Sequence, residues 1–455
     1  MFLVQKPRYL FYIIAFLLPI QVGIYVEQVL GITFTPQLIT GILLFIIIIL
    51  NFLISRIVTP IPLFGLWFIF VSLSSIAFMR NPAITNPIQG AWVIFRLAIV
   101  NALIYPAYWW FFKDPRKTRL FFTVLSASAA LSGIIAVIQT ITNGNLLSGV
   151  FTNHRFLGFL FPFPPEVTQE NVAVLQAHFW FDGIFRGHGM FYRANGFGAF
   201  MSVVVGITWG MFRFSRPKLR LMFLVLLLAE IAGVIVSFSR TAWVAVLFSI
   251  FIAVCIEGFF GGRRKQFLRI FRMAMYIFLL LLSIVIISLQ IPSIADRFST
   301  VSGFQNVGEV SWRIEIWKKA LHAIIDHPIL GTGNQIVTTI PVGGIDSGFG
   351  SHNLFVGIAF ETGLLSFFIF LFFVFCLFLT SWKGYRYSNE LQDKMISFAI
   401  LIGSVDLIIV GMGTSIFDIE NIIVIFWFML AAAINMQYRI KNNIVNLPDI
   451  TNPGQ

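Results

Sequence analysis

Long stretches of apolar residues alternate with short polar segments along almost the whole chain. A helix needs about 20 apolar residues to cross the ~30 Å hydrocarbon core of a bilayer. The pattern therefore predicts an all-α polytopic membrane protein with about twelve transmembrane helices. Pro60 and Pro62 separate two of the shorter stretches, which could form a re-entrant pair, although two full spans fit the charge pattern better. The predicted spans are 9–26, 38–54, 62–79, 91–111, 119–141, 192–212, 219–236, 240–257, 268–289, 353–379, 395–412 and 421–437.

The composition agrees with this pattern and excludes two classes of protein. Hydrophobic residues make up 58% of the chain and charged residues 11%, against about 25% charged residues in typical soluble domains. A soluble globule could not bury so much apolar surface, and a disordered chain would be polar and highly charged. The two cysteines, Cys255 and Cys376, lie in apolar stretches without metal-ligand or disulfide spacing, so we interpret them as small buried side chains.

The net charge of +12 reflects membrane topology rather than nucleic-acid binding. With a cytoplasmic N-terminus, 21 of the 31 Lys and Arg residues fall in cytoplasmic loops and nine fall outside, as the positive-inside rule predicts. No cleavage signature follows the first span, which favours a membrane helix over a removed signal peptide. The predicted order is helices 1–5 in 1–141, a first outer loop 142–191, helices 6–9 in 192–289, a large outer loop 290–352, helices 10–12 in 353–441 and a cytoplasmic tail 442–455.

Arginine is the main basic residue of the predicted outer side, which also holds all the histidines. Seven of the nine outer basic residues are Arg, whose planar guanidinium binds phosphate through paired hydrogen bonds. This favours an anionic, lipid-linked substrate, although single Arg side chains also snorkel to membrane interfaces without any such role. All six histidines lie on this side, namely His154, His178, His188, His322, His327 and His352.

Three ionisable residues fall within predicted spans: Arg96, Glu230 and Asp406. Charges inside a bilayer are costly and usually face a partner or a wet cavity. We predict an ion pair between Arg96 and one of the two acids, as a structural lock between helices rather than a catalytic group.

The second outer loop contains an amphipathic helix. Apolar residues recur at helical spacing from Val310 to Ile325, and polar residues such as Arg313 fill the other face. Such a helix lies on the outer membrane surface or over a cavity. Pro328 ends it, and a Gly-rich segment, 343–350, follows.

The tripeptide Ser351-His352-Asn353 comes directly before the tenth span and has two readings. Ser and Asn are favoured N-cap residues, so the tripeptide predicts a helix start. A histidine at this place could also abstract a proton or bind an anion, helped by the backbone N–H groups of the helix.

Four short motifs surround the outer loops, and together they resemble a known family. They are Phe185–Phe191 leading to Asn195 and Gly196, Ser237–Ala242, the stretch from Arg313 through Trp317, His327 and Pro328 to Gly331–Gly333, and Ser351–Asn353 followed by Glu361–Leu365. In their order and placement, over about 185–380, the chain resembles the bacterial O-antigen ligase and O-antigen polymerase family of membrane glycosyltransferases.

The resemblance implies a twelve-span inner-membrane protein with a periplasmic active site. Such a protein would transfer a glycan from an undecaprenyl diphosphate carrier, without a nucleotide sugar, a cofactor or an essential metal. The acceptor would be lipid A-core in a ligase, another lipid-linked repeat in a polymerase, or protein in an O-linking oligosaccharyltransferase, and the sequence leaves this choice open. The catalytic residues implied by the resemblance are His352, Arg240, Arg186 and Arg313, and our further candidates for substrate binding are Arg193, Arg297, Asn353, His327 and Arg96.

The chemistry of such a transfer suits these residue types. The leaving lipid diphosphate is a stable anion, so pre-aimed arginines would stabilise its growing charge. An imidazole, with an ordinary pKa of about 6.5, could take the proton of the attacking sugar hydroxyl, and attack opposite the leaving group predicts inversion. Two hypotheses from other classes stay open: a transporter or flippase of lipid-linked glycan, and a non-catalytic partner in polysaccharide assembly.

Overall fold

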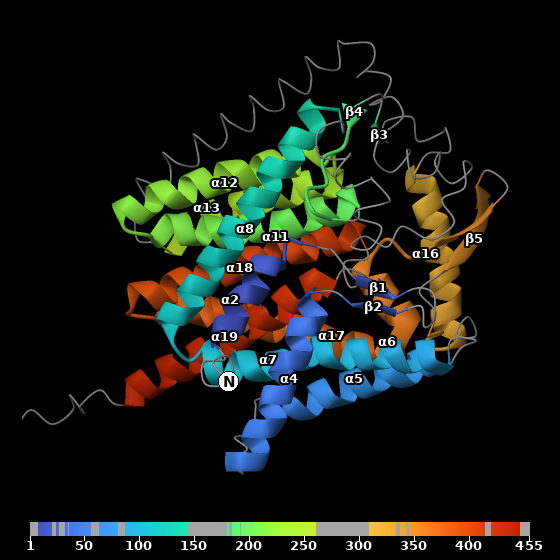
Figure 1. The fold of residues 1–455 in the computed structure, drawn as a ribbon, viewed down its shortest axis with the longest axis horizontal. Helices are drawn as coiled ribbons and strands as arrows, with labels where there is room; N and C mark the ends of the chain where they lie inside the picture. Colours follow the sequence, from blue (N-terminus) through green and yellow to red (C-terminus); the bar gives the residue numbers. More distant parts are fainter. Residues whose placement is uncertain are drawn as a thin grey trace, which may run out of the picture.

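The computed structural model describes residues 8–20, 24–26, 32–34, 36–55, 63–80, 87–143, 180–181, 184–191, 193–260, 309–333, 337–342, 345–414 and 420–445. These residues form a helical bundle with three two-stranded antiparallel hairpins (Figure 1). The helices are α2 (Arg8–Leu17), α4 (Pro36–Ser55), α5 (Phe64–Met79), α6 (Pro87–Ala102), α7 (Ile104–Pro106), η1 (Ala107–Phe111), α8 (Pro115–Ile141), α11 (Ala194–Phe214), α12 (Pro217–Val236), α13 (Arg240–Phe260), α16 (Glu309–Asp326), α17 (Leu354–Tyr387), α18 (Leu391–Gly413) and α19 (Glu420–Val445). The hairpins pair β1 (Ile24–Val26) with β2 (Ile32–Phe34), β3 (Trp180–Phe181) with β4 (Ile184–Phe185), and β5 (Thr338–Val342) with β6 (Ile345–Phe349).

The protein is a polytopic membrane protein. Seven of the described helices are long and apolar enough to cross a membrane: α8, α11, α12, α13, α17, α18 and the Asn421–Ile440 part of α19. Shorter apolar helical segments lie in α4 and α5. The predicted ninth span, 268–289, and most of the first outer loop lie outside the described residues.

Two sequence predictions need correction. The first predicted span is helical only to Leu17; Pro19 follows, and the chain then forms the β1–β2 hairpin. The fourth span changes its winding at Pro106, which lacks an N–H, and continues as the π-helical η1. The fold class predicted from the sequence is confirmed as all-helical, with three short two-stranded hairpins added at the ends of helices and in loops.

Helix α11 lies at the centre of the bundle, packed against α8, α12, α13 and α18. Small residues permit this close approach: Gly210 lies against the backbone of Ala399, and Gly133 lies against Gly233 where α8 meets α12. Helices in membranes associate through such small residues because apolar surface gives no preference for protein over lipid.

The two acids predicted within spans both face α11. Glu230 accepts a hydrogen bond from the Thr208 hydroxyl at 2.9 Å, and the Asp406 carboxyl lies directly against Gly206. Both side chains are fully buried. Arg96 lies instead on α6, which packs against α4, α5 and α19, so this arrangement does not support the predicted ion pair.

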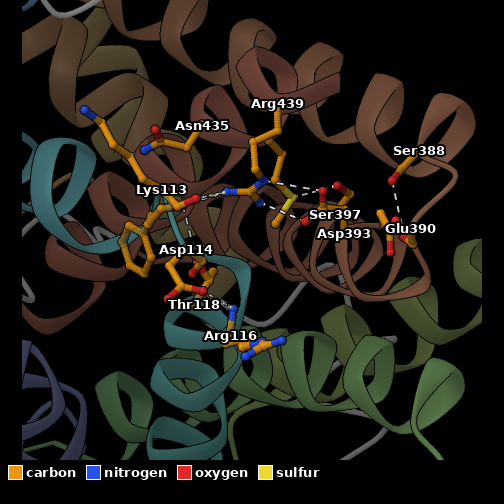
Figure 2. A network of polar contacts seen from close by, with 12 residues as sticks. Lys113, Asp114, Arg116, Thr118, Ser388, Glu390, Asp393, Ser397, Asn435 and Arg439 are labelled. Atoms are coloured by element: carbon orange, nitrogen blue, oxygen red, sulfur yellow. Dashed lines mark hydrogen bonds and ion pairs between the residues drawn. The ribbon is translucent and has the colours of Figure 1, made fainter. Parts of the chain in front are cut away.

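At the end of the bundle predicted to be cytoplasmic, Arg439 ties three helices together. Figure 2 shows its guanidinium between the Asp393 carboxylate and the backbone that precedes α8. Arg439 Nη2 donates to Asp393 Oδ1, and Nη1 donates to the carbonyls of Phe112 and Lys113, each at 2.9 Å. The pair is largely shielded, since 6% of the Asp393 side chain and 18% of the Arg439 side chain are exposed.

Replacing Arg439 by alanine is expected to lower the free energy of unfolding by about 3 kcal/mol, because Asp393 would stay buried without its partner. Thermal unfolding of the purified variant measures this effect. Lys117→Ala is the matched control: its ion pair with Asp114, at 4.0 Å, is partly exposed, and its loss should cost less than about 1 kcal/mol. Equal stability of the two variants would contradict the assignment.

Candidate active site at one end of the bundle

Helix α17 is interrupted at Gly363, whose φ of 86° lies in the left-handed region. The break leaves backbone groups without intrahelical partners, and the segment Pro328–Gly333 provides them. Irregular backbone is tolerated at membrane depth only where such partners exist. Two of the sequence motifs therefore form one structural unit. The bonds run from Thr332 N to Phe360 O (2.8 Å), from Gly333 N to Glu361 O (2.9 Å) and from Leu364 N to Pro328 O (2.7 Å).

His352 stands directly before α17 in a strained backbone conformation, with φ of 48°. The next residue, Asn353, caps the helix, because its Oδ1 accepts hydrogen bonds from the N–H groups of Phe355 at 2.9 Å and Val356 at 3.1 Å. The cap predicted from the sequence is therefore present. The His352 side chain beside this cap is half-buried.

Helix α16 holds this tripeptide against the end of α18. Trp317 Nε1 donates to the carbonyl of Ser351 at 2.8 Å. One turn earlier, Arg313 Nη1 donates to Gly413 O at 3.2 Å. Asn353 Nδ2 donates to Met412 O at 3.0 Å. Arg313 and the neighbour of His352 thus bind consecutive carbonyls at the end of the same helix.

Arg186 braces the turn between α12 and α13. Its Nε and Nη2 donate to Ser237 O at 3.1 and 2.9 Å, and Nη2 also donates to Asn195 Oδ1 at 2.6 Å. Asn195 lies in the first turn of α11. The guanidinium therefore fixes the start of α11 relative to the turn that leads to Arg240.

Arg240 is exposed at the first position of α13. The next residue, Thr241, contacts Gly413: a Cβ built on this glycine would lie 2.7 Å from Thr241 Oγ1. Arg313 binds the carbonyl of the same glycine. A continuous series of contacts thus connects the Arg186 brace, the start of α13, the end of α18, Arg313 and the residues around His352.

One comparison with known proteins identifies part of this region. Residues 223–371 match the family model described as O-antigen ligase. The chain carries a domain of the O-antigen ligase family. No curated protein matches the chain significantly. The family consists of membrane enzymes of polysaccharide assembly, ligases and polymerases that act on lipid-linked glycans.

Three of the four residues predicted to be catalytic lie inside the O-antigen ligase domain: Arg240, Arg313 and His352. Arg186 precedes it and reaches it through Ser237. The domain also contains both parts of the helix break, the Pro328–Gly333 segment and Gly363.

Four other residues predicted to bind substrate lie elsewhere in the chain. Arg193 is exposed at the start of α11, and His327 is exposed at the turn after α16. Arg96 lies on α6, outside the helices that carry the O-antigen ligase domain, and Arg297 lies outside the described residues. Among the described residues, no group of three or more His, Cys, Asp or Glu side chains could hold a metal ion.

Gln139, which sequence reasoning missed, shapes the loop before α11. Its Oε1 accepts hydrogen bonds from the N–H groups of His188 (3.1 Å) and Gly189 (3.0 Å), and its Nε2 donates to Gly189 O (3.0 Å). The signal in the sequence was a single polar amide near the outer end of a predicted span. Nδ1 of His188 lies 2.7 Å from Phe191 O, so this histidine serves the loop rather than the site.

Burial lowers the pKa of His188 to about 4, against an ordinary value of 6.5, although the Phe191 carbonyl opposes the shift. The folded protein therefore keeps His188 neutral where the unfolded chain already takes up a proton. Stability should fall as the pH decreases from about 6.5 toward 4. We expect His188→Gln to flatten this dependence in thermal unfolding across that range, and the exposed His322→Gln to leave it unchanged. An unaltered profile in His188→Gln would contradict this.

Trp317→Phe is expected to slow glycan transfer by about threefold to tenfold, because a smaller aromatic ring stays in place and one hydrogen bond of about 1 kcal/mol is lost. Trp67→Phe is the control, since it loses a similar bond, to Asn101 O at 3.2 Å, on α5. Initial rates of both variants, measured beside their thermal unfolding, separate positioning of His352 from general stability. Similar rates in the two variants would exclude a positioning role for Trp317.

Proposed function

We propose that the protein is an O-antigen ligase-like glycosyltransferase that moves a glycan from an undecaprenyl diphosphate carrier to a sugar hydroxyl at the extracytoplasmic face of the bacterial inner membrane. The observation that carries the proposal is that α16, the start of α13 and the start of α17 all contact the end of α18. Arg313 and Asn353 bind the carbonyls of Gly413 and Met412, and Thr241 contacts Gly413. This arrangement brings two arginine-bearing elements and the histidine-bearing helix start to one place.

The proposed roles follow from the chemistry of each group. The acceptor hydroxyl oxygen attacks the anomeric carbon, the bond from that carbon to the diphosphate oxygen breaks, and the proton passes to the imidazole of His352. Arg240 and Arg313 stabilise the negative charge that develops on the diphosphate. Attack opposite the leaving group inverts the anomeric centre.

For Arg186 we propose a supporting role. Its guanidinium is anchored to Ser237 O and Asn195, so we assign it first to holding the turn before α13. Arg240, exposed at the first position of that helix, is the better candidate for direct contact with the diphosphate. The N–H groups of a helix start add positive potential for an anion there.

A polymerase of the same family would use the same bond changes with a different acceptor. The two activities separate by product: a ligase transfers a glycan to lipid A-core, whereas a polymerase lengthens the chain on the carrier. Our assignment to a ligase follows the description of the matched family.

The test is transfer by the purified, reconstituted protein, supplied with undecaprenyl diphosphate-linked glycan and with lipid A-core, and followed on a gel. We expect product from the wild type and a rate lower by about 10²-fold in Arg240→Ala. The control is Arg216→Ala, which removes an arginine before α12 at the opposite end of the bundle. A flippase would instead move the lipid-linked glycan across vesicles and give no product, which would overturn the proposal.

A further inference from the structure

Helix α16 has two apolar faces, and only one of them packs against protein. Ile316, Ala320 and Ile324 are buried, and Ala320 and Ile324 form a cluster with Ala359 and Phe360 of α17. This face attaches α16 to the bundle. One apolar face is enough for an amphipathic helix on a protein surface, so the second face needs its own explanation.

The second face carries Ile314, Leu321 and Ile325, which stand seven and four residues apart. They are exposed, with 58% of Leu321 and 66% of Ile325 accessible. The spacing places all three along one line of the helix. Further round the helix, Glu315 and Lys319 form an exposed ion pair at 3.8 Å, so the water-facing side is a different one.

This apolar line continues into the membrane-spanning part of α17. Ile329 is exposed and lies beside the helix break, where Pro328 O accepts a hydrogen bond from Leu364 N. Just beyond the break, Leu365 and Phe368 are exposed on the span. Because these side chains contact lipid in a membrane-spanning helix, the C-terminal end of α16 lies at the level where the bilayer begins.

We infer that the α16 stripe, made of Ile314, Leu321, Ile325 and Ile329, rests on the acyl chains of the bilayer at the membrane–water boundary. Helix α16 runs across the end of the bundle rather than along it (Figure 1), which is the orientation of a helix lying in the interface. Lys318, exposed beside the stripe, reaches lipid phosphates in this position, as lysines flanking apolar stripes do.

The inference goes beyond the proposed function, because it concerns contact with bulk lipid and holds whatever the enzyme transfers. It has a consequence for the site. The buried side of α16 carries Arg313 and Trp317, which bind Gly413 and Ser351. Lipid contact on the neighbouring face therefore sets the height of these residues above the bilayer.

The test uses single cysteines in the full-length protein, in a background with Cys255→Ala and Cys376→Ala, reconstituted into phosphatidylglycerol–phosphatidylethanolamine vesicles. A fluorescent label is placed by Leu321→Cys or Ile325→Cys on the stripe and, as matched control, by Glu315→Cys on the water-facing side of the same helix. Quenching by a nitroxide on the lipid acyl chain is compared with quenching by aqueous iodide.

We expect the two stripe labels to be quenched at least threefold more by the lipid nitroxide than the control label, and the control label more by iodide. Equal iodide quenching at 321 and 315 would overturn the inference. Protection of position 321 from both quenchers would also overturn it, and would point to a second protein on the stripe. In the chain that keeps both native cysteines, a benzophenone amino acid at position 321 should cross-link phospholipid, while one at 315 should not.

Discussion

Replacing His352 by asparagine is expected to lower the rate of glycan transfer by at least about 10²-fold, because the acceptor hydroxyl loses its base. Asparagine is chosen because it tolerates the left-handed φ of 48° found at this position. The cap formed by Asn353 and the hydrogen bond from Trp317 to Ser351 O do not use the imidazole, so the helix start should persist. The measurement is kcat and KM for transfer, beside thermal unfolding.

The matched control is His322→Asn, which changes an exposed histidine on the outer side of α16. It should leave both kinetic constants unchanged. A base lost from the site should reduce kcat more than it raises KM, whereas a disturbed binding site would do the reverse. Full activity in His352→Asn with normal protein levels would remove this residue from the mechanism.

The helices could be predicted from the sequence, because apolar length is read directly from the residues. α8, α11, α12, α13, α18 and most of α19 lie within a few residues of their predicted spans. The failures have local causes. Pro19 and Pro106 fall inside apolar stretches. The hydropathy pattern therefore predicts a continuous helix across them, although proline interrupts the helical backbone. The hairpin β1–β2 follows where the first span was predicted to continue.

The site could be predicted only in part. The residues around His352 and the three arginines were named from their types and from a family resemblance, yet their connections are backbone contacts between distant segments. Arg313 binds Gly413 O and Asn353 binds Met412 O, and no periodicity marks a carbonyl as a partner. Gln139 was missed for the same reason, since its bonds run to the backbone of Gly189, 50 residues away.

In helix α17, neither the interruption of the helix nor the segment that contacts it could be predicted from the sequence. Its apolar pattern predicted one continuous span, 353–379, whereas the helix breaks at Gly363 and then continues to Tyr387. Gly331, with φ of 64°, belongs to the segment Pro328–Gly333 and lies against this break. Both glycines belong to motifs identified in the sequence. The sequence does not indicate, however, that the two glycines contact each other.

Gly363→Ala is therefore expected to lower the free energy of unfolding by about 3 kcal/mol or more and to abolish most of the activity. A φ of 86° with ψ of 168° is essentially restricted to glycine and costs other residues about 1–3 kcal/mol. A Cβ here would also overlap the carbonyl of Ile329, which would push the Pro328–Gly333 segment off the helix break. Phe360 O and Glu361 O would then lose the hydrogen bonds that Thr332 N and Gly333 N donate to them, and each shielded carbonyl left unpaired costs about 1–3 kcal/mol.

The control for this prediction is Gly65→Ala. Gly65 lies in α5, and a Cβ built on it meets no other atom within 4 Å, so alanine should be neutral or stabilising by up to about 1 kcal/mol. Thermal unfolding and transfer rates of both variants are compared in the same vesicles. If Gly363→Ala unfolds like the wild type and still transfers glycan, then the break in α17 is not required, and the packing of α16 through Ala320 and Ile324 is enough to hold Arg313 and Trp317 in place.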